Sequence, residues 1–301
     1  MDEHIDPAEH GARQGSLVIV GGGEDRENSK DVLARFVELA GGRDKKIVVI
    51  TAASKIPEEM WAIYDQAFGD LGVARRSPLH ARSRADANDP DLVRELDDAD
   101  GIFMTGGDQR RLLGMIGGTA LDTAIHRALK QRGACVGGTS AGASAMSGHM
   151  LADGKVDLNP EKGAVSLGAG LGLVQRVVID QHFSERHRLA RLLAVVAQNP
   201  YLQGIGIDEN TALVVRRGVG MDVIGDGSVT IVDGRHMISN VVDIRDRSIP
   251  ELIDVRLHLL PSGSSHCLPL ADGQPAPAAF REVPAPLLEF LSNIVKRTPL
   301  L

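Results

Sequence analysis

Short apolar runs alternate with amphipathic segments along the first two thirds of the chain. Runs that are apolar throughout are typical of strands buried on both faces of a sheet, and the helices between them cover those faces. Because strands joined by helical crossovers run in the same direction, this order predicts an α/β protein with a mostly parallel, doubly wound sheet. Strands are expected at residues 16–20, 46–51, around Val73, 101–105, 134–136 and 177–180, and helices at about 29–40, from Pro57, and at about 90–96, 109–116, 119–132 and 184–198.

The last third of the chain has a different pattern, in which short strand-like runs are separated by turn signals such as Asp226-Gly227 and Asp233-Gly234. This pattern predicts antiparallel strands added to the parallel sheet. We expect a tail at residues 1–15 and one α/β domain at 16–301. The expected pieces are strands at 204–209 and 211–215 joined by a tight turn, strands within 221–233 and at 240–244, loops at 151–172 and 261–286, and a closing helix near 287–296.

The composition argues against several classes of partner. The net charge of −7 is unlike that of nucleic-acid-binding domains, which concentrate Lys and Arg on one face. No stretch reaches the ~18 apolar residues of a membrane span, and the first residues carry no apolar core of a secretory signal. Two cysteines, Cys135 and Cys267, are too few to staple a fold. We therefore expect a cytoplasmic protein that binds neither nucleic acid nor membranes.

A serine lies between glycines where a strand is expected to turn into a helix. The run Gly138-Thr139-Ser140-Ala141-Gly142 matches the G-x-S-x-G pattern of hydrolase nucleophile elbows, and it follows an apolar run. At such an elbow the side chain stands clear of the sheet, and the helix N-terminus faces any negative charge that forms nearby. The pattern predicts that Ser140 is a nucleophile.

A serine nucleophile needs a base, and the base needs an acid to orient it. Functional groups of doubly wound sheets gather at the carboxyl ends of the strands. Of the ten histidines, His182 is the best placed, because it follows the expected strand at 177–180. Asp208 and Glu209 follow the strand 204–207, and the two-residue period of a strand leaves either of them as the acid.

Two glycine-rich turns invite a functional interpretation. Gly21-Gly22-Gly23-Glu24 resembles a dinucleotide-binding fingerprint, but Arg26 occupies the place of the third glycine, so nucleotide binding is not expected. Gly106-Gly107 ends the strand at 101–105. The amide of Gly107, together with that of Ala141, is expected to form an oxyanion hole.

The segment after His182 is unusually basic. Arg188 and Arg191 are three residues apart, so on the predicted helix they share one face. One interpretation is a solvated face on which Glu185 pairs with Arg188 or His187. The other is a set of guanidinium groups that binds a carboxylate of the substrate.

At these residues the chain resembles the cyanophycinases, which are serine exopeptidases of the peptidase S51 group, and more distantly the aspartyl dipeptidases of peptidase E type. The resemblance runs from about residue 17 to 215 and implies a flavodoxin-like core akin to that of class I glutamine amidotransferases, with serine in place of their cysteine. It rests on the motifs at 21–24, 103–109, 138–143, 180–183 with the arginines that follow, and 206–212.

The resemblance also implies the roles of individual residues. The triad becomes Ser140, His182 and Glu209, which decides between the two candidate acids by analogy. No metal or other cofactor is expected. The implied substrate-binding residues are Gln109, Asp180, Gln181, Arg186, Arg188 and Arg191.

The substrate implied is cyanophycin, a poly-aspartate whose β-carboxylates carry arginine, and the product is the β-Asp-Arg dipeptide. Asp180 and the carbonyl groups of Gln109 and Gln181 are expected to receive a guanidinium, and the arginines to hold carboxylates. The resemblance further implies a homodimer. The alternatives are an α-aspartyl dipeptidase and a catalytically inactive peptide-binding homologue.

Overall fold

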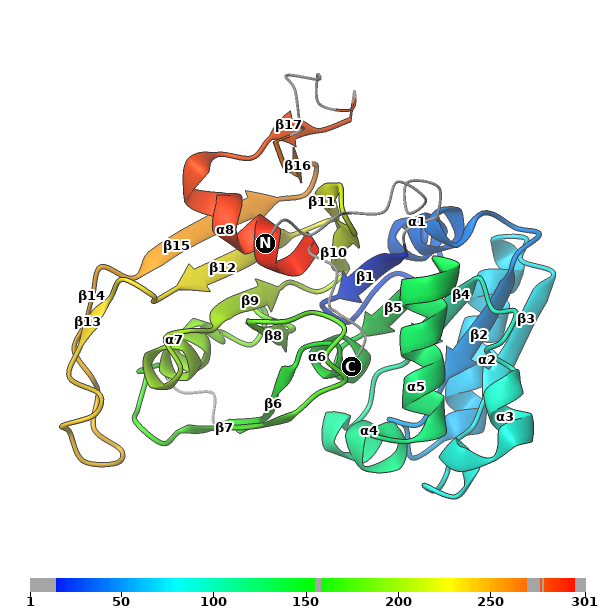
Figure 1. Ribbon diagram of the computed structural model, residues 1–301, viewed down its shortest axis with the longest axis horizontal. Helices are drawn as coiled ribbons and strands as arrows, with labels where there is room; N and C mark the ends of the chain where they lie inside the picture. The colour runs from blue at the N-terminus through cyan, green and yellow to red at the C-terminus, as the bar shows by residue number, and fades with distance from the viewer. Residues whose placement is uncertain (1–14, 155–157, 270–276, 278, 296–301) are drawn as a thin grey trace, which may run out of the picture.

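The larger of the two main sheets holds the strands that the sequence pattern predicts to be parallel, except the one expected at 177–180, which lies in a second sheet (Figure 1). The computed structural model describes residues 15–154, 158–269, 277 and 279–295, and its largest sheet has the order β17-β16-β11-β10-β1-β5-β4-β2-β3. The strands of this sheet are β1 Ser16–Val20, β2 Lys46–Ile50, β3 Arg75–Leu79, β4 Gly101–Met104, β5 Cys135–Thr139, β10 Thr211–Arg216, β11 Gly220–Gly225, β16 Ser265–Cys267 and β17 Arg281–Glu282.

The neighbours β1, β5, β4, β2 and β3 are all parallel. Counted from β2, the order β3-β2-β4-β5 is the 2-1-3-4 order of flavodoxin-like sheets, and β1 takes the place of the fifth strand. β10 and β11 extend the sheet in antiparallel fashion beyond β1. The predicted α/β class, with a mostly parallel sheet and antiparallel strands in the last third, is confirmed.

Helices cover both faces of this sheet, as a doubly wound fold requires. On one face, α1 (Asp31–Ala40) and α2 (Pro57–Asp70) bury Phe36, Tyr64 and Phe68 against Phe103 of β4. On the other face lie α3 (Pro90–Arg94), which follows a 3-10 turn at Asp86–Asn88, α4 (Gln109–Ile116) and α5 (Ala120–Arg127), which continues into a π-helical turn at Ala128–Arg132.

A second sheet stands beside the large one in the order β15-β12-β9-β8. Its strands are β8 Val177–Gln181, β9 Gln203–Ile207, β12 Ser228–Asp233 and β15 Arg256–Pro261. One face of it packs on α7 (Leu189–Gln198), while the other shares the main core with α8 (Ala285–Val295). The two sheets are therefore joined through one apolar core.

The strands expected at 204–209 and 211–215 do not pair with each other. β9 pairs with β8 and β12, and β10 pairs with β1 and β11, so both edges of each strand are already filled. Asn210, with φ of 45°, turns the chain from one sheet into the other. The tight turn was predicted correctly, but it connects two sheets.

The helix expected from Ser184 begins at Leu189. His182 and His187 both have left-handed backbone conformations, with φ of 49° and 50°, and these interrupt a helix. Residues 182–188 therefore form turns, and Arg188 is the N-cap of α7.

Several expected loops contain short strands. Residues 151–172 include most of the hairpin β6 (His149–Gly154) and β7 (Val165–Ala169), whose side chains are mostly only partly buried and give little hydrophobic signal. β16 and β17 lie within the loop expected at 261–286. The strand expected at 240–244 does not form, because these residues make a turn between the two-residue strands β13 (Ile238–Ser239) and β14 (Leu252–Ile253). The third strand begins at Arg75 and does not include Val73.

Candidate active site

The glycine-lined elbow forms as the sequence predicts. β5 ends at Thr139, the five-residue helix α6 (Ala141–Ala145) follows, and Ser140 between them has φ of 51° and ψ of −108°. A Cβ on Gly142 would lie 2.4 Å from the carbonyl oxygen of Met104, so only glycine allows the elbow to pack on β4. Ser140 stands at the carboxyl ends of the parallel strands.

Ser140, His182 and Glu209 form a hydrogen-bonded chain. The hydroxyl oxygen of Ser140 is 3.0 Å from Nε2 of His182, and Nδ1 of His182 is 2.6 Å from Oε1 of Glu209. The imidazole is 13% exposed, whereas Glu209 is 40% exposed. This is the geometry in which an imidazole takes a proton from a serine while a carboxylate orients it.

The electrostatic surroundings keep His182 ready to accept a proton. Burial lowers the pKa of His182 below its ordinary value of 6.5, and the positive charges of Arg186 and Arg188 lower it further. The hydrogen bond and the charge of Glu209 oppose this and raise the pKa. The net shift is downward, so the imidazole is neutral at pH 7.

Of the two candidate acids, Glu209 contacts His182, whereas Asp208 contacts Ser184 and Ser228. Asp208 is buried and accepts hydrogen bonds from the amide of Ser184 at 3.1 Å and from the amide and hydroxyl of Ser228 at 3.0 and 2.8 Å. It thus fixes the turn that follows His182. Glu185 does not make the ion pairs expected of a solvated helix face, because its Oε1 accepts from the amide of Glu209 at 3.1 Å.

The triple glycine after β1 lies against His182 and Glu209. The carbonyl of Gly21 accepts from the amide of His182 at 2.7 Å. A Cβ on Gly22 would lie 2.3 Å from Cε1 of His182, and one on Gly23 would lie 3.0 Å from Oε2 of Glu209. The comparison with nucleotide-binding loops did not predict that these glycines make room for His182 and Glu209. The feature that could have indicated it is their position at the end of β1, the strand that pairs with β5 before the elbow.

Gly106 and Gly107 form a turn beside the nucleophile. A Cβ on Gly106 would lie 4.0 Å from the hydroxyl oxygen of Ser140, and Gly107, with φ of 144°, packs on the carbonyl of Ala53. Ala141 begins α6 on the other side of Ser140. A polar cavity of about 330 Å³ adjoins this turn and is lined by residues 107–110, 151–154 and Arg191.

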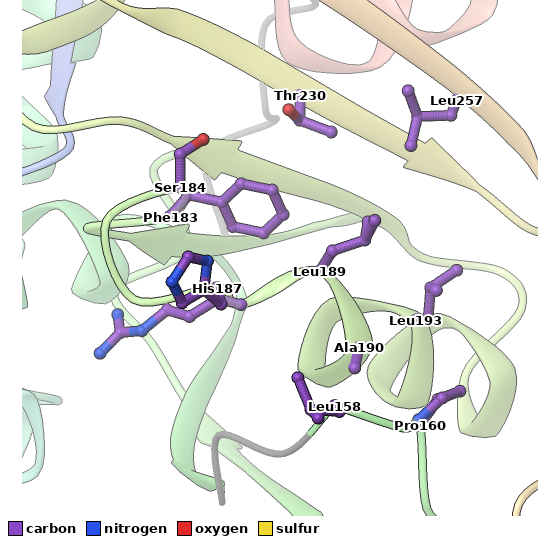
Figure 2. A pocket seen from close by; sticks show the side chains of 11 residues that line it. Leu158, Pro160, Phe183, Ser184, His187, Leu189, Ala190, Leu193, Thr230 and Leu257 are labelled. Carbon is purple, nitrogen blue, oxygen red and sulfur yellow. The ribbon is translucent and has the colours of Figure 1, made fainter.

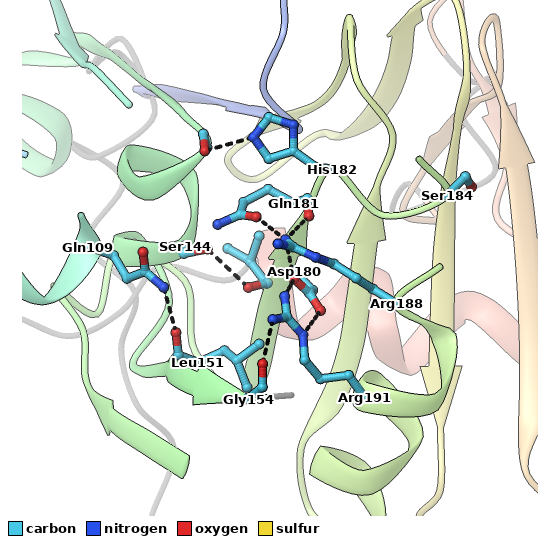
Figure 3. A network of polar contacts seen from close by, with 12 residues as sticks. Gln109, Ser144, Leu151, Gly154, Asp180, Gln181, His182, Ser184, Arg188 and Arg191 are labelled. Carbon is cyan, nitrogen blue, oxygen red and sulfur yellow. Dashed lines mark hydrogen bonds and ion pairs between the residues drawn. The ribbon is translucent and has the colours of Figure 1, made fainter. Parts of the chain in front are cut away.

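Two of the three predicted arginines, Arg188 and Arg191, meet around Asp180 (Figure 3). Arg191 donates to Asp180 through Nε at 2.9 Å and through a terminal nitrogen, and Arg188 donates to the same carboxylate at 3.1 Å. Arg188 also donates to the backbone and side-chain oxygens of Gln181. The side chain of Asp180 is 1% exposed, so its carboxylate serves these two arginines.

Gln109 lines the polar cavity, and Arg191 lines it too while also belonging to the Asp180 network. Gln109 donates to the carbonyl of Leu151 at 3.1 Å, and Arg191 donates to that of Gly154 at 3.3 Å (Figure 3). Arg186 is exposed, near enough to His182 for its charge to lower the pKa of the imidazole. Burial lowers the pKa of Arg188 to about 10, which leaves it charged at pH 7.

A second cavity, of about 490 Å³, was not foreseen from the sequence (Figure 2). Its lining is mostly apolar and includes Phe183, Leu189, Leu193 and Leu257, together with Arg188. Arg188 therefore touches this cavity as well as the Asp180 network.

Neither a metal site nor a membrane span is found in the described ranges. Within residues 15–154, 158–269, 277 and 279–295, no three His, Cys, Asp or Glu side chains converge as metal ligands would. In the same ranges no helix has the length and apolarity to cross a bilayer.

Comparison with known proteins places this geometry in a family. The sequence profile of Peptidase family S51 matches residues 17–221. A protein named Cyanophycinase from Geminocystis herdmanii is 38% identical over 252 residues, covering 83% of this chain and 93% of the relative. The Cyanophycinase of Synechococcus elongatus is 36% identical over 86% of this chain and 81% of its own length, and that of a Nostoc species is 34% identical over 84% and 85%.

Solved structures show the same fold. A peptidase from an acI-B1 actinobacterium superposes with a TM-score of 0.63 at 27% identity, covering 83% of this chain and 96% of that one. A putative peptidase E protein of Listeria monocytogenes gives 0.51 at 21% identity over 70% and 98%, a likeness that concerns the fold alone. The chain therefore belongs to peptidase family S51.

Proposed function

We propose that this protein is a cyanophycinase, a serine exopeptidase that releases β-Asp-Arg dipeptides from cyanophycin. The hydrogen-bonded chain from Ser140 through His182 to Glu209, with distances of 3.0 and 2.6 Å, carries the proposal. The proteins named Cyanophycinase that match over more than four fifths of the chain supply the substrate.

The proposed reaction proceeds through an acyl-enzyme. Nε2 of His182 takes the hydroxyl proton of Ser140, whose oxygen attacks the scissile carbonyl while Glu209 stabilises the imidazolium. The amides of Gly107 and Ala141 bind the resulting oxyanion. His182 then gives its proton to the leaving amine, and a water molecule, activated by the same imidazole, releases the acyl group.

The carboxylates of a cyanophycin unit have cationic counterparts around the nucleophile. Arg186 is exposed beside His182, and Arg191 and Gln109 line the polar cavity, so these residues are the proposed direct contacts. Asp180 acts by holding Arg188 and Arg191 in place, because its carboxylate is buried between them. Gln181 also holds Arg188, because it accepts from the same guanidinium nitrogen that donates to Asp180.

The substrate is tested by comparing cyanophycin with Asp-X dipeptides at equal enzyme concentration. We expect cyanophycin to be cleaved with a kcat/KM at least a hundredfold above that of any Asp-X dipeptide. The opposite preference would make the protein an aspartyl dipeptidase of peptidase E type.

A fluorophosphonate probe tests whether the site is active at all. We expect the probe to label the wild type at Ser140 and to leave the Ser140→Ala variant unlabelled. Absence of labelling in the wild type would favour an inactive peptide-binding homologue. The homodimer and the cytoplasmic location stay predictions, and light scattering of the purified protein tests the first.

A further inference from the structure

Glu24 is a buried carboxylate next to the elbow, and the reaction described above does not use it. It follows the triple glycine after β1 and is 3% exposed. Its Oε2 accepts from the hydroxyl of Thr139 at 2.5 Å, and its Oε1 accepts from the hydroxyl of Tyr64 on α2. Two hydroxyl donors offset the cost of burying a carboxylate.

Thr139 is the residue immediately before Ser140. The conformation of Ser140, with φ of 51° and ψ of −108°, is one that a non-glycine residue keeps only when its surroundings hold it. The amide of Ser140 is tied to the carbonyl of Val20 at 3.1 Å. The bond between Thr139 and Glu24 ties the elbow to the segment after β1 a second time.

The same segment also holds the other two members of the triad. The carbonyl of Gly21 accepts from the amide of His182 at 2.7 Å, and the carbonyl of Gly22 accepts from the amide of Asn210 at 2.9 Å. The side chain of Asn210, the residue after Glu209, accepts from the amide of Asp25 at 2.8 Å. Residues 20–25 therefore contact the elbow, the base and the neighbour of the acid.

We propose that Glu24 is a positioning residue for the reaction: through Thr139 it fixes the elbow that presents Ser140 to His182. Tyr64 supports it from α2, because burial and the nearby carboxylate raise the pKa of this phenol well above its ordinary 10.0 and keep it a donor. The inference rests on the proposed role of Ser140 as the nucleophile.

A pair of substitutions at Thr139 tests the inference. Thr139→Val removes the hydroxyl at nearly constant volume, and Thr139→Ser keeps it. The measurements are the rate of fluorophosphonate labelling, kcat and KM on cyanophycin, and Tm. We expect Thr139→Val to lower the labelling rate and kcat at least tenfold with KM within twofold, and Thr139→Ser to stay within threefold of the wild type.

Substitutions of Glu24 and Tyr64 extend the test. Glu24→Gln should lower kcat as Thr139→Val does, and the double variant should be no worse than the poorer single variant, because both act through one bond. Tyr64→Phe should have a smaller effect, since Tyr64 does not contact the elbow directly. If Glu24→Gln fails to fold, the Thr139 pair still decides the question.

The opposite result is a Thr139→Val enzyme with normal labelling rate and kcat and only a lower Tm, which would make Glu24 a purely structural residue. Labelling separates this inference from the choice of substrate. A wild type that is labelled but leaves cyanophycin intact would overturn the substrate and leave the Thr139 comparison valid. A wild type that is not labelled would overturn both.

Discussion

His182 is hydrogen-bonded to both Ser140 and Glu209, so we expect the titration of its imidazole to govern the pH dependence of the proposed reaction. The base must be neutral to accept a proton. Because burial lowers its pKa below 6.5, we expect the acid limb of the kcat/KM profile to lie below pH 6.5.

Glu209→Gln removes the charge that raises the pKa of His182. The acid limb should therefore move to still lower pH, and kcat should fall by about 10³- to 10⁴-fold, as when the acid of such a triad becomes an amide. A pH profile of kcat/KM measures both effects. A limb that moves to higher pH would contradict the described electrostatics.

Arg186→Gln should move the same limb in the opposite direction, because the charge of Arg186 lowers the pKa of His182. As a proposed substrate contact, its loss should also raise KM about tenfold, the worth of one charge-assisted hydrogen bond. Arg186→Lys keeps the positive charge and serves as the control, because it should leave the acid limb of the kcat/KM profile in place. An unchanged limb and KM in Arg186→Gln would exclude Arg186 from the site.

Individual residues of the site differ in how far the sequence could predict them. The elbow and the rule that side chains gather at strand ends were enough to single out Ser140 and His182. Periodicity left Asp208 and Glu209 equivalent, because the left-handed Asn210 that turns the chain between two sheets is not visible in a strand pattern. The burial of Asp180 between two arginines was not foreseen, since it depends on where α7 begins.

At the scale of elements, the segment between β1 and α1 leaves no room for a side chain beneath the imidazole. Gly22→Ala should lower kcat at least a hundredfold, because its Cβ would lie 2.3 Å from the ring of His182. Gly42→Ala is a matched control: Gly42 has φ of 104°, close to the 98° of Gly22, and open space around it. Activity assays and thermal unfolding should show a cost of about 1–2 kcal/mol for Gly42→Ala, with its kcat preserved. Equal activities of the two variants would contradict the contact.

Most elements of the parallel sheet were predicted well because the buried strands are largely apolar. The exception is the edge strand β3 (Arg75–Leu79), whose first three residues are polar and whose position was misjudged. The errors fall where tertiary contacts decide the structure. The start of α7 depends on left-handed residues at 182 and 187, and the hairpin β6–β7 carries too few buried side chains to give a clear pattern.

At the scale of the whole molecule, one apolar core includes residues from Leu17 of β1 to Val295 of α8. We therefore expect the described parts of the chain to unfold as a single unit, as the proposed single domain at 16–301 requires. Phe290 on α8 is fully buried in this core, and Phe290→Ala should cost about 3–5 kcal/mol.

Trp61 on α2, the single tryptophan of the chain, reports unfolding at the opposite side of the large sheet. In Phe290→Ala, the denaturant concentration at the midpoint of the Trp61 fluorescence change should be lower than in the wild type. Activity should be lost over the same range of denaturant. Leu288→Ala, on the exposed side of the same helix, should change the midpoint little. If Phe290→Ala left the midpoint of the Trp61 fluorescence change unaltered, the chain would contain two domains that unfold independently.

The central claim is that Ser140 releases β-Asp-Arg from cyanophycin, and mass analysis of the products tests it most directly. The wild type should produce the intact dipeptide and no free arginine, while folded Ser140→Ala, with an unchanged Tm, should produce neither. Turnover by Ser140→Ala, or free arginine as the product of the wild type, would contradict the claim.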